Sequence, residues 1–139
     1  MRGVFVIILM MADKKIILLV EDEKLLLNLL KQRLEQEEFD VITAKNGEEA
    51  LRILKGTKPD LILLDIILPK ISGFELMENV RKDPGYGKSP IIIISNLGQE
   101  SDIERGKALG AVGYFVKAHV SIEDLVGQVK GFFGGVKSS

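Results

Sequence analysis

The chain has 139 residues, room for one domain, and its 19 Lys and Arg against 20 Asp and Glu give a formal net charge of −1. This balance argues against a basic nucleic-acid-binding surface. The chain has no cysteine and one histidine, which excludes disulfide frameworks, thiolate zinc sites, cysteine nucleophiles and two-histidine metal sites within one chain.

The first feature in chain order is an apolar stretch at residues 4–12, VFVIILMMA. It is shorter than the roughly 20 residues of a membrane span, and no small-x-small cleavage site separates it from Lys14. One interpretation is an upstream start codon before a natural start at Met10 or Met11. The other is an ordered extension buried on its own domain or in a homodimer contact. We therefore expect three segments: an apolar N-terminal extension at 1–12, a main domain at 13–133 and a short C-terminal tail at 134–139.

Short, solidly apolar runs alternate with helical patterns along the rest of the chain. Such runs are typical of strands buried on both faces of a parallel sheet. The solidly apolar runs predict strands at 16–20, 61–64 and 91–94, and weaker patterns predict strands at 41–44 and 112–116. The predicted helices are 23–38, 47–55, 73–83, 99–109 and 121–133. Asn46, Ser72 and Ser121 with Asp124 supply helix start signals. Five strands alternating with five helices indicate an α/β fold, a doubly wound five-stranded parallel sheet with helices on both faces.

The carboxyl ends of the predicted strands carry the chemistry, because the ligand site of an open α/β sheet lies beyond them. These ends carry Glu21-Asp22-Glu23 after the first strand, Asp65 after the third, Ser95 on the fourth and Lys117 on the fifth. Converging carboxylates repel one another unless a cation lies among them. Oxygen ligands without thiolates or imidazoles favour Mg²⁺ or Mn²⁺. Acids at the first turn argue against a flavin or dinucleotide site, which would present glycines and amides.

Taken singly, these residues have plainer interpretations. Glu21 and Glu23 are also typical of the acidic first turn of a helix, where the helix dipole favours them. Lys117 is also typical of a solvated strand end, and Tyr114 of a core strand residue. Their joint occurrence at successive strand ends favours the functional interpretation.

Together these motifs resemble the receiver domain of two-component response regulators over about residues 14–133. The motifs are, in order, Leu19-Val20-Glu21-Asp22-Glu23, Asp65 followed by Leu68-Pro69 and Gly73, Pro90 through Ser95, and Gly113-Tyr114-Phe115-Val116-Lys117. The resemblance implies the flavodoxin-like strand order 2-1-3-4-5. It also implies a cytoplasmic phosphoprotein that acts in a phosphorelay and in signal transduction.

The resemblance assigns a role to each of these residues. Asp65 would be the phosphoacceptor, a nucleophile that takes a phosphoryl group from a partner's phosphohistidine. Glu21, Asp22, Asp65 and the main-chain carbonyl of Ile67 would hold Mg²⁺. Lys117 would pair with one phosphoryl oxygen and Ser95 would donate to another. The signal would then pass from Ser95 through Tyr114 to a face formed by the helix at 99–109, the strand at 112–116 and the helix at 121–133.

On these grounds we expect a single-domain response regulator, which is a switch and not a classical enzyme. Its phosphoryl donor would be a histidine kinase or phosphotransfer protein, and its target a downstream protein, with no direct nucleic-acid or membrane contact. One alternative is a pseudo-receiver that binds partners without phosphorylation. Another is a haloacid-dehalogenase-like phosphatase, which would need a second Asp at the position of Ile67.

Four residues depart from the family pattern or bear on the lifetime of the phosphoryl group. Asn96 stands where a small residue usually follows the Ser or Thr, and Ala118 replaces the usual Pro after the lysine. The cis peptide common at that Pro is therefore not expected, since a non-proline cis bond costs about 2.5–4 kcal/mol. Ile67 and Leu97 are both apolar, and in the family these positions flank the path of the hydrolytic water. We expect a long-lived phosphoryl group.

The helix predicted at 23–38 carries an apolar stripe at helical spacing. Its members are Leu26, Leu29, Leu30 and Leu34, with Leu27 at the margin. Leu25 falls well off this stripe. It is either a stray exposed leucine, which is common, or a residue that docks the helix of the phosphodonor.

Overall fold

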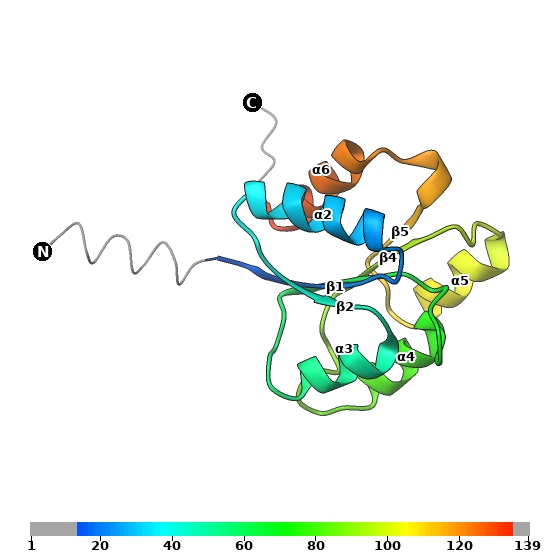
Figure 1. Ribbon diagram of the computed structural model, residues 1–139. Coiled ribbons are helices and arrows are strands. Elements are labelled where there is room, and N and C mark those ends of the chain that lie inside the picture. The colour runs from blue at the N-terminus through cyan, green and yellow to red at the C-terminus, as the bar shows by residue number, and fades with distance from the viewer. Residues whose placement is uncertain (1–13, 135–139) are drawn as a thin grey trace, which may run out of the picture.

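The computed structural model describes residues 14–134, so the apolar extension predicted at 1–12 lies outside the described residues. Strands and helices alternate along the chain (Figure 1). In order they are β1 (Ile16–Val20), α2 (Lys24–Gln36), β2 (Asp40–Ala44), α3 (Gly47–Leu54), β3 (Leu61–Leu64), α4 (Gly73–Arg81), β4 (Ile91–Ser95), α5 (Glu100–Ala108), β5 (Gly113–Val116), the short 3₁₀ helix η1 (Lys117–His119) and α6 (Ile122–Phe132). Every predicted strand and helix is present, and no end differs from the prediction by more than two residues.

The five strands form one parallel sheet in the order β2-β1-β3-β4-β5, which confirms the predicted order. The register aligns the ends of neighbouring strands: Val20 of β1 lies beside Ala44 of β2 and Leu64 of β3. Because the strands run parallel, the residues that follow Val20 and Leu64 emerge at the same edge of the sheet.

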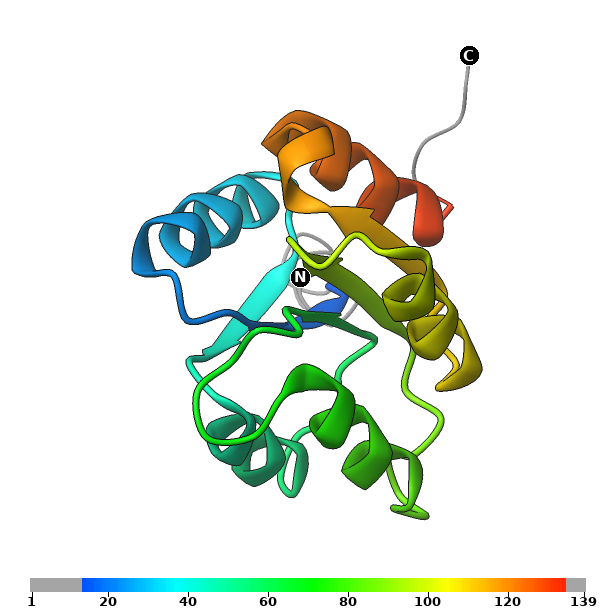
Figure 2. The same cartoon turned by 90° about the vertical axis from the view of Figure 1, so that its right-hand side faces the viewer.

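Alternate residues of each central strand enter two separate cores. Ile17, Leu19 and Leu63 pack on one face, while Leu18, Val20 and Leu64 pack on the other. Helices α2 and α6 cover the first face, and α3, α4 and α5 cover the second (Figures 1 and 2). Both faces of the sheet are therefore covered, which explains why the central strands β1, β3 and β4 are almost entirely apolar and not alternating.

The ends of several helices are fixed by local hydrogen bonds. The side chains of Asn46 and Ser72 accept bonds from backbone N–H groups three residues on, as their N-cap positions predict. Ser121 and Asp124 form a reciprocal capping box at the start of α6. Helix α2 ends before the predicted residue 38, because Glu38 has a φ of 69° in the left-handed region, which no helix interior accommodates.

We expect Ser121→Ala to lower the free energy of unfolding by about 1 kcal/mol, because the first turn of α6 loses the side-chain acceptor for the Asp124 N–H. The measurement is the midpoint of urea denaturation at unchanged slope. Ser101→Ala is the matched control, since Ser101 is exposed within α5 and its change should stay within about 0.5 kcal/mol. Equal shifts for the two variants would contradict the capping role.

Arg81, the last residue of α4, joins two loops at the edge of the sheet opposite the strand carboxyl ends. Its guanidinium donates to the carbonyls of Gly87 and Ser89 in the loop before β4, at 3.0 and 2.7 Å. It also donates to Leu109 and Gly110 at the end of α5, at 2.9 and 3.2 Å. One side chain thus satisfies four backbone carbonyls that face no helix or sheet partner.

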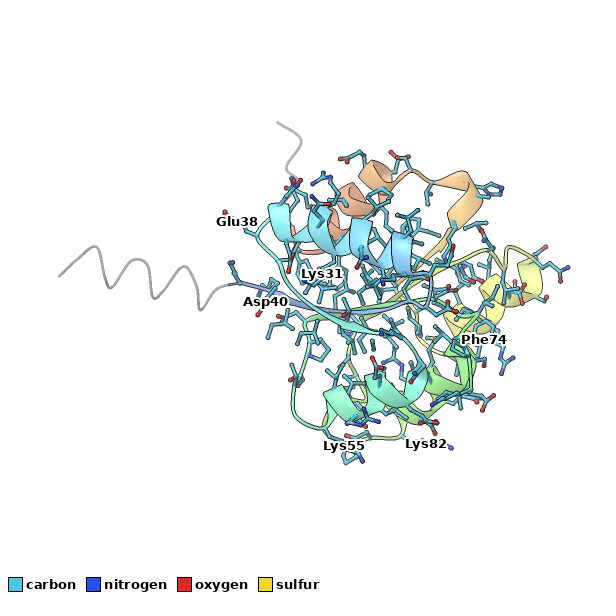
Figure 3. The ribbon with its side chains drawn as sticks, in the orientation of Figure 1. Lys31, Glu38, Asp40, Lys55, Phe74 and Lys82 are labelled. Carbon is cyan, nitrogen blue, oxygen red and sulfur yellow. The ribbon has the colours of Figure 1, made fainter. Side chains whose placement is uncertain are left out.

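The outer surfaces of the helices are polar. Lys55 and Lys82 are exposed and point away from the sheet, and Lys31 pairs with Glu35 at 3.1 Å along α2 (Figure 3). Within residues 14–134, none of the helices combines the length and apolar character needed to cross a membrane.

Candidate functional site

The predicted carboxylates meet at the carboxyl edge of the sheet. Backbone bonds place them there: Asp65 N–H donates to Val20 O, and Glu21 N–H donates to Ala44 O, both at 3.0 Å. Ligand oxygens of Glu21, Asp22 and Asp65 all lie within 4.8 Å of one another. Glu21 and Asp65 are buried, at 0% and 2% exposure, whereas Asp22 is exposed to solvent. The cluster therefore has a buried floor and one open side.

Among residues 14–134, the ammonium group of Lys117 is the only one that contacts the buried carboxylates of Glu21 and Asp65. Lys117 begins η1, directly after β5, and its Nζ lies 2.8 Å from Asp65 Oδ2 and 3.0 Å from Glu21 Oε1. The same Nζ lies 2.6 Å from Glu23 Oε2. One cation thus serves three carboxylates.

Burial controls the electrostatics of this cluster. Burial raises the pKa of Glu21 to about 7, and the negative charge of Asp65 adds to the effect, although the Glu23 N–H and Lys117 partly offset it. Burial lowers the pKa of Lys117, but its hydrogen bonds to Asp65 and Glu23 and its ion pair with Glu21 outweigh this and hold the pKa above its usual range. Lys117 therefore stays charged, but its single positive charge does not balance the negative charges of the three carboxylates that it contacts.

The donor set fits a hard divalent cation such as Mg²⁺. Its ligands are all carboxylate oxygens, which Mg²⁺ prefers. Glu21 Oε2 accepts from the Glu23 N–H at 3.0 Å, but the buried Oε1 accepts no hydrogen bond despite its ion-pair distance to Lys117. A buried carboxylate oxygen that lacks a donor is costly unless a cation satisfies it. Glu21, Asp22 and Asp65 are therefore the residues that would hold the ion.

Ser95 and Tyr114 are linked through the backbone of Leu97. Ser95, fully buried at the end of β4, accepts a hydrogen bond from the Leu97 N–H at 3.3 Å. The Tyr114 hydroxyl in β5 donates to the Leu97 carbonyl at 2.5 Å. Burial raises the pKa of Tyr114, with Asp102 and Asp65 adding to it, so the hydroxyl remains a donor. No hydrogen bond joins Ser95 to Asp65 in the described part of the chain.

The residues that depart from the family pattern lie around the entrance. Asn96 and Ala118 are exposed and line one shallow hollow with the start of α2. No cis peptide bond occurs in residues 14–134, so the bond between Lys117 and Ala118 is trans. The side chain of Ile67 is 52% exposed, and its N–H donates to Asp65 Oδ1 at 3.0 Å.

The buried stripe of α2 differs from the predicted one at Leu27 and Leu29. Leu27, Leu30 and Leu34 are buried, Leu26 is half-buried, and Leu29 is 40% exposed. The prediction that Leu29 belongs to the buried face is therefore wrong, because the helix turns its 27–30–34 ridge toward the sheet. Leu25 lies off the stripe as predicted, at 75% exposure, and lines the same hollow as Leu29 and Asn96.

Glu23 is the site residue that the sequence left unassigned. It is the N-cap residue of α2, but its side chain makes no capping bond and contacts Lys117 instead. Only its position in the Glu21-Asp22-Glu23 run signals this contact, and a run of acids before a helix equally indicates a first turn.

Comparison with known proteins shows which family and which relatives this chain is similar to. The family model described as the response regulator receiver domain matches residues 17–130. The chain is 42% identical over 102 residues to the phosphate regulon transcriptional regulatory protein PhoB of Rhizobium meliloti, a match that covers 73% of this chain but 44% of PhoB. It is 32% identical over 106 residues to Protein PilH of Pseudomonas aeruginosa, covering 76% of this chain and 87% of PilH.

The solved structures share the fold as well. The phosphorylated cyanobacterial phytochrome response regulator RcpA superimposes with a TM-score of 0.75 at 32% identity, covering 86% of this chain and 91% of RcpA. The chain thus spans nearly all of RcpA and less than half the length of PhoB.

Proposed function

Because the chain belongs to the response regulator receiver domain family, we propose that it is a switch controlled by a phosphoryl group on Asp65. Receiver domains are signalling switches that interact with histidine kinases and downstream targets. One observation carries the proposal for this chain: Asp65 is buried at the end of β3, 2.8 Å from the Lys117 ammonium and beside the carboxylates of Glu21 and Asp22. The donor proposed is a phosphohistidine of a kinase or phosphotransfer protein.

The chemistry proposed is a transfer between two nucleophiles. An Asp65 carboxylate oxygen attacks phosphorus, an O–P bond forms, and the P–N bond of the phosphohistidine breaks with its electron pair leaving on the imidazole nitrogen. Mg²⁺ held by Glu21, Asp22, Asp65 and the Ile67 carbonyl would neutralise charge on the phosphoryl oxygens. Lys117 holds Asp65 in position before transfer and is placed to pair with a phosphoryl oxygen after it.

The proposed output uses the Ser95–Leu97–Tyr114 connection. Without a phosphoryl group, the Leu97 N–H donates to the Ser95 hydroxyl oxygen. When the Ser95 hydroxyl turns to donate to a phosphoryl oxygen, the Ser95 oxygen moves relative to the Leu97 N–H. A shift of Leu97 also moves the carbonyl that holds the Tyr114 hydroxyl. The two bonds on one residue therefore connect the phosphoryl site to the surface formed by α5, β5 and α6, where we propose that a downstream protein binds.

The test is incubation with acetyl phosphate, with and without Mg²⁺, followed by intact-mass measurement. We expect one phosphoryl group per chain, none when EDTA removes the metal, and release by hydroxylamine, which cleaves acyl phosphates. The absence of any modification would favour a pseudo-receiver. Steady multiple turnover of a phosphomonoester would favour the phosphatase instead, although Ile67 occupies the position of its general acid.

We expect the acyl phosphate to persist for minutes or longer, because neither Ile67 nor Leu97 carries a polar group that can orient a water molecule for attack. The measurement is the decay of phosphoprotein after the donor is removed. Ile67→Asn should shorten the half-life several-fold and Ile67→Val should leave it unchanged. A wild-type half-life of seconds would contradict the expectation.

We propose that Leu25 helps to dock the phosphodonor, because an apolar side chain exposed at 75% stands beside the acidic cluster. Leu25→Gln, which removes the apolar side chain without adding a charge to the entrance, should slow transfer from the phosphorylated donor protein about tenfold, while labelling by acetyl phosphate stays unchanged, and both rates are measured on the same preparation. Val112→Gln is the control, since Val112 is 56% exposed at the opposite edge of the sheet. Equal losses in both assays would rule out a docking role.

A further inference from the structure

Glu23 lies where a simple receiver site would need no carboxylate. Its Oε2 is 2.6 Å from Lys117 Nζ, the shortest of the three ion pairs that this lysine makes. Glu21, Asp22 and Asp65 are the residues that would hold Mg²⁺, which leaves Glu23 as the one carboxylate around the lysine with no metal to bind.

The backbone aims this side chain at the lysine. The Glu23 N–H donates to Glu21 Oε2 at 3.0 Å, and its carbonyl accepts from the Leu27 N–H at 2.9 Å, so both sides of the residue are fixed. An N-cap carboxylate ordinarily accepts from the first turn of its helix, but this one makes no such bond. Its side chain is 59% exposed, which leaves it free to move away when the lysine turns to another anion.

The formal charges around the site show what the Glu23–Lys117 contact does to an incoming phosphoryl group. Glu21, Asp22 and Asp65 contribute −3, which Mg²⁺ and Lys117 would balance with +3. Glu23 adds a fourth negative charge at the open side of the site, against the same ammonium that a phosphoryl oxygen must reach. A like charge placed near an incoming anion opposes its approach.

We propose that Glu23 competes with the phosphoryl group for Lys117, holding the lysine in the unphosphorylated protein and slowing phosphorylation. This inference rests on the proposed function of Asp65 as phosphoacceptor. Glu23 is a positioning residue, because it acts on the reaction through Lys117 and the charge at the entrance.

The test compares wild type with Glu23→Gln, which keeps the shape of the side chain and removes its charge. We expect the variant to be phosphorylated by acetyl phosphate about threefold faster or more at low salt, and the difference to shrink at high salt. Glu78→Gln is the matched control, since Glu78 is exposed on α4 and makes no ion pair within residues 14–134. A rate for Glu23→Gln no higher than wild type, or an equal gain in Glu78→Gln, would overturn the proposal.

A second measurement needs neither metal nor phosphodonor. Reductive methylation of Lys117, followed by peptide mass mapping in EDTA, should proceed at least about twofold faster in Glu23→Gln, because the ammonium loses its shortest ion pair. An unchanged methylation rate would contradict the proposal that Glu23 holds Lys117. If wild type takes up no phosphoryl group, the proposed function fails, whereas uptake without a gain in Glu23→Gln defeats this inference alone.

Discussion

Asp65→Asn should abolish phosphoryl uptake from acetyl phosphate, while wild type gains one group per chain. An amide oxygen is not a nucleophile under these conditions, and the other carboxylates cannot replace Asp65. Glu21 is fully buried beneath the Lys117 contact, and Asp22 is exposed and forms no ion pair with a lysine in the described part of the chain. Intact-mass spectrometry measures the uptake, and thermal unfolding shows that the variant is folded.

The control for this substitution is Asp40→Asn. Asp40 is exposed at the start of β2, where it pairs with Ile16, so it lies at the edge of the sheet away from the site (Figure 3). This variant removes the same charge and should be labelled like wild type. Retention of the label in Asp65→Asn would place the phosphoryl group on another residue and defeat the proposed function.

Gly73→Ala should have the largest structural effect of any single methyl added near the site. A Cβ at Gly73 would lie 2.5 Å from the Asp65 carbonyl oxygen and 2.6 Å from Ile66 Cα, both of them backbone atoms directly beside the phosphoacceptor. Gly73 N–H also donates to Ile66 O at 2.8 Å, which fixes the close approach. We expect a loss of about 1–3 kcal/mol in the free energy of unfolding, measured by urea denaturation.

The same variant should be phosphorylated about tenfold more slowly or worse, because the loop that carries Asp65 must shift to make room for the methyl group. Gly127→Ala is the control: beyond its own helical segment, no atom of residues 14–134 lies within 4 Å of its added Cβ, and alanine should stabilise α6 by about 0.5–1 kcal/mol. Equal stability changes for the two variants would show that the crowding at Gly73 is relieved without cost.

Where hydrophobic pattern decides the structure, the sequence predicts it well. The solid apolar runs locate the three central strands and weaker patterns locate β2 and β5, and Asn46, Ser72 and Ser121 cap the helices that they are expected to start. Strand order came from the family resemblance, because period and length say which segments are strands but not which of them are neighbours. The juxtaposition of Asp65 with Glu21 and Asp22 followed from one rule, that parallel strands end at the same edge.

Side-chain direction decides the rest, and a local pattern does not contain it. Leu27 and Leu29 are both compatible with an apolar stripe, and only the packing of α2 on the sheet buries one and exposes the other. Glu23 contacts Lys117 only because the fold brings the residue that follows β5, 94 positions along the chain, to the start of α2. In the sequence, Arg81 is an ordinary basic residue at a helix end, and only the fold shows that its guanidinium donates to carbonyls of two loops.

The four carbonyl bonds of Arg81 also bear on how α5 can move. Two of them join Leu109 and Gly110, which follow this helix, to Arg81 at the end of α4, while the segment at its amino end, around Leu97, is joined to Ser95 and Tyr114. A displacement of α5 that preserves the Arg81 bonds is therefore a pivot about its far end. In the proposed switch, the amplitude of such a pivot would be greatest beside Asp65 and smallest at Gly110, so a binding partner would sense phosphorylation chiefly at the first turn of α5.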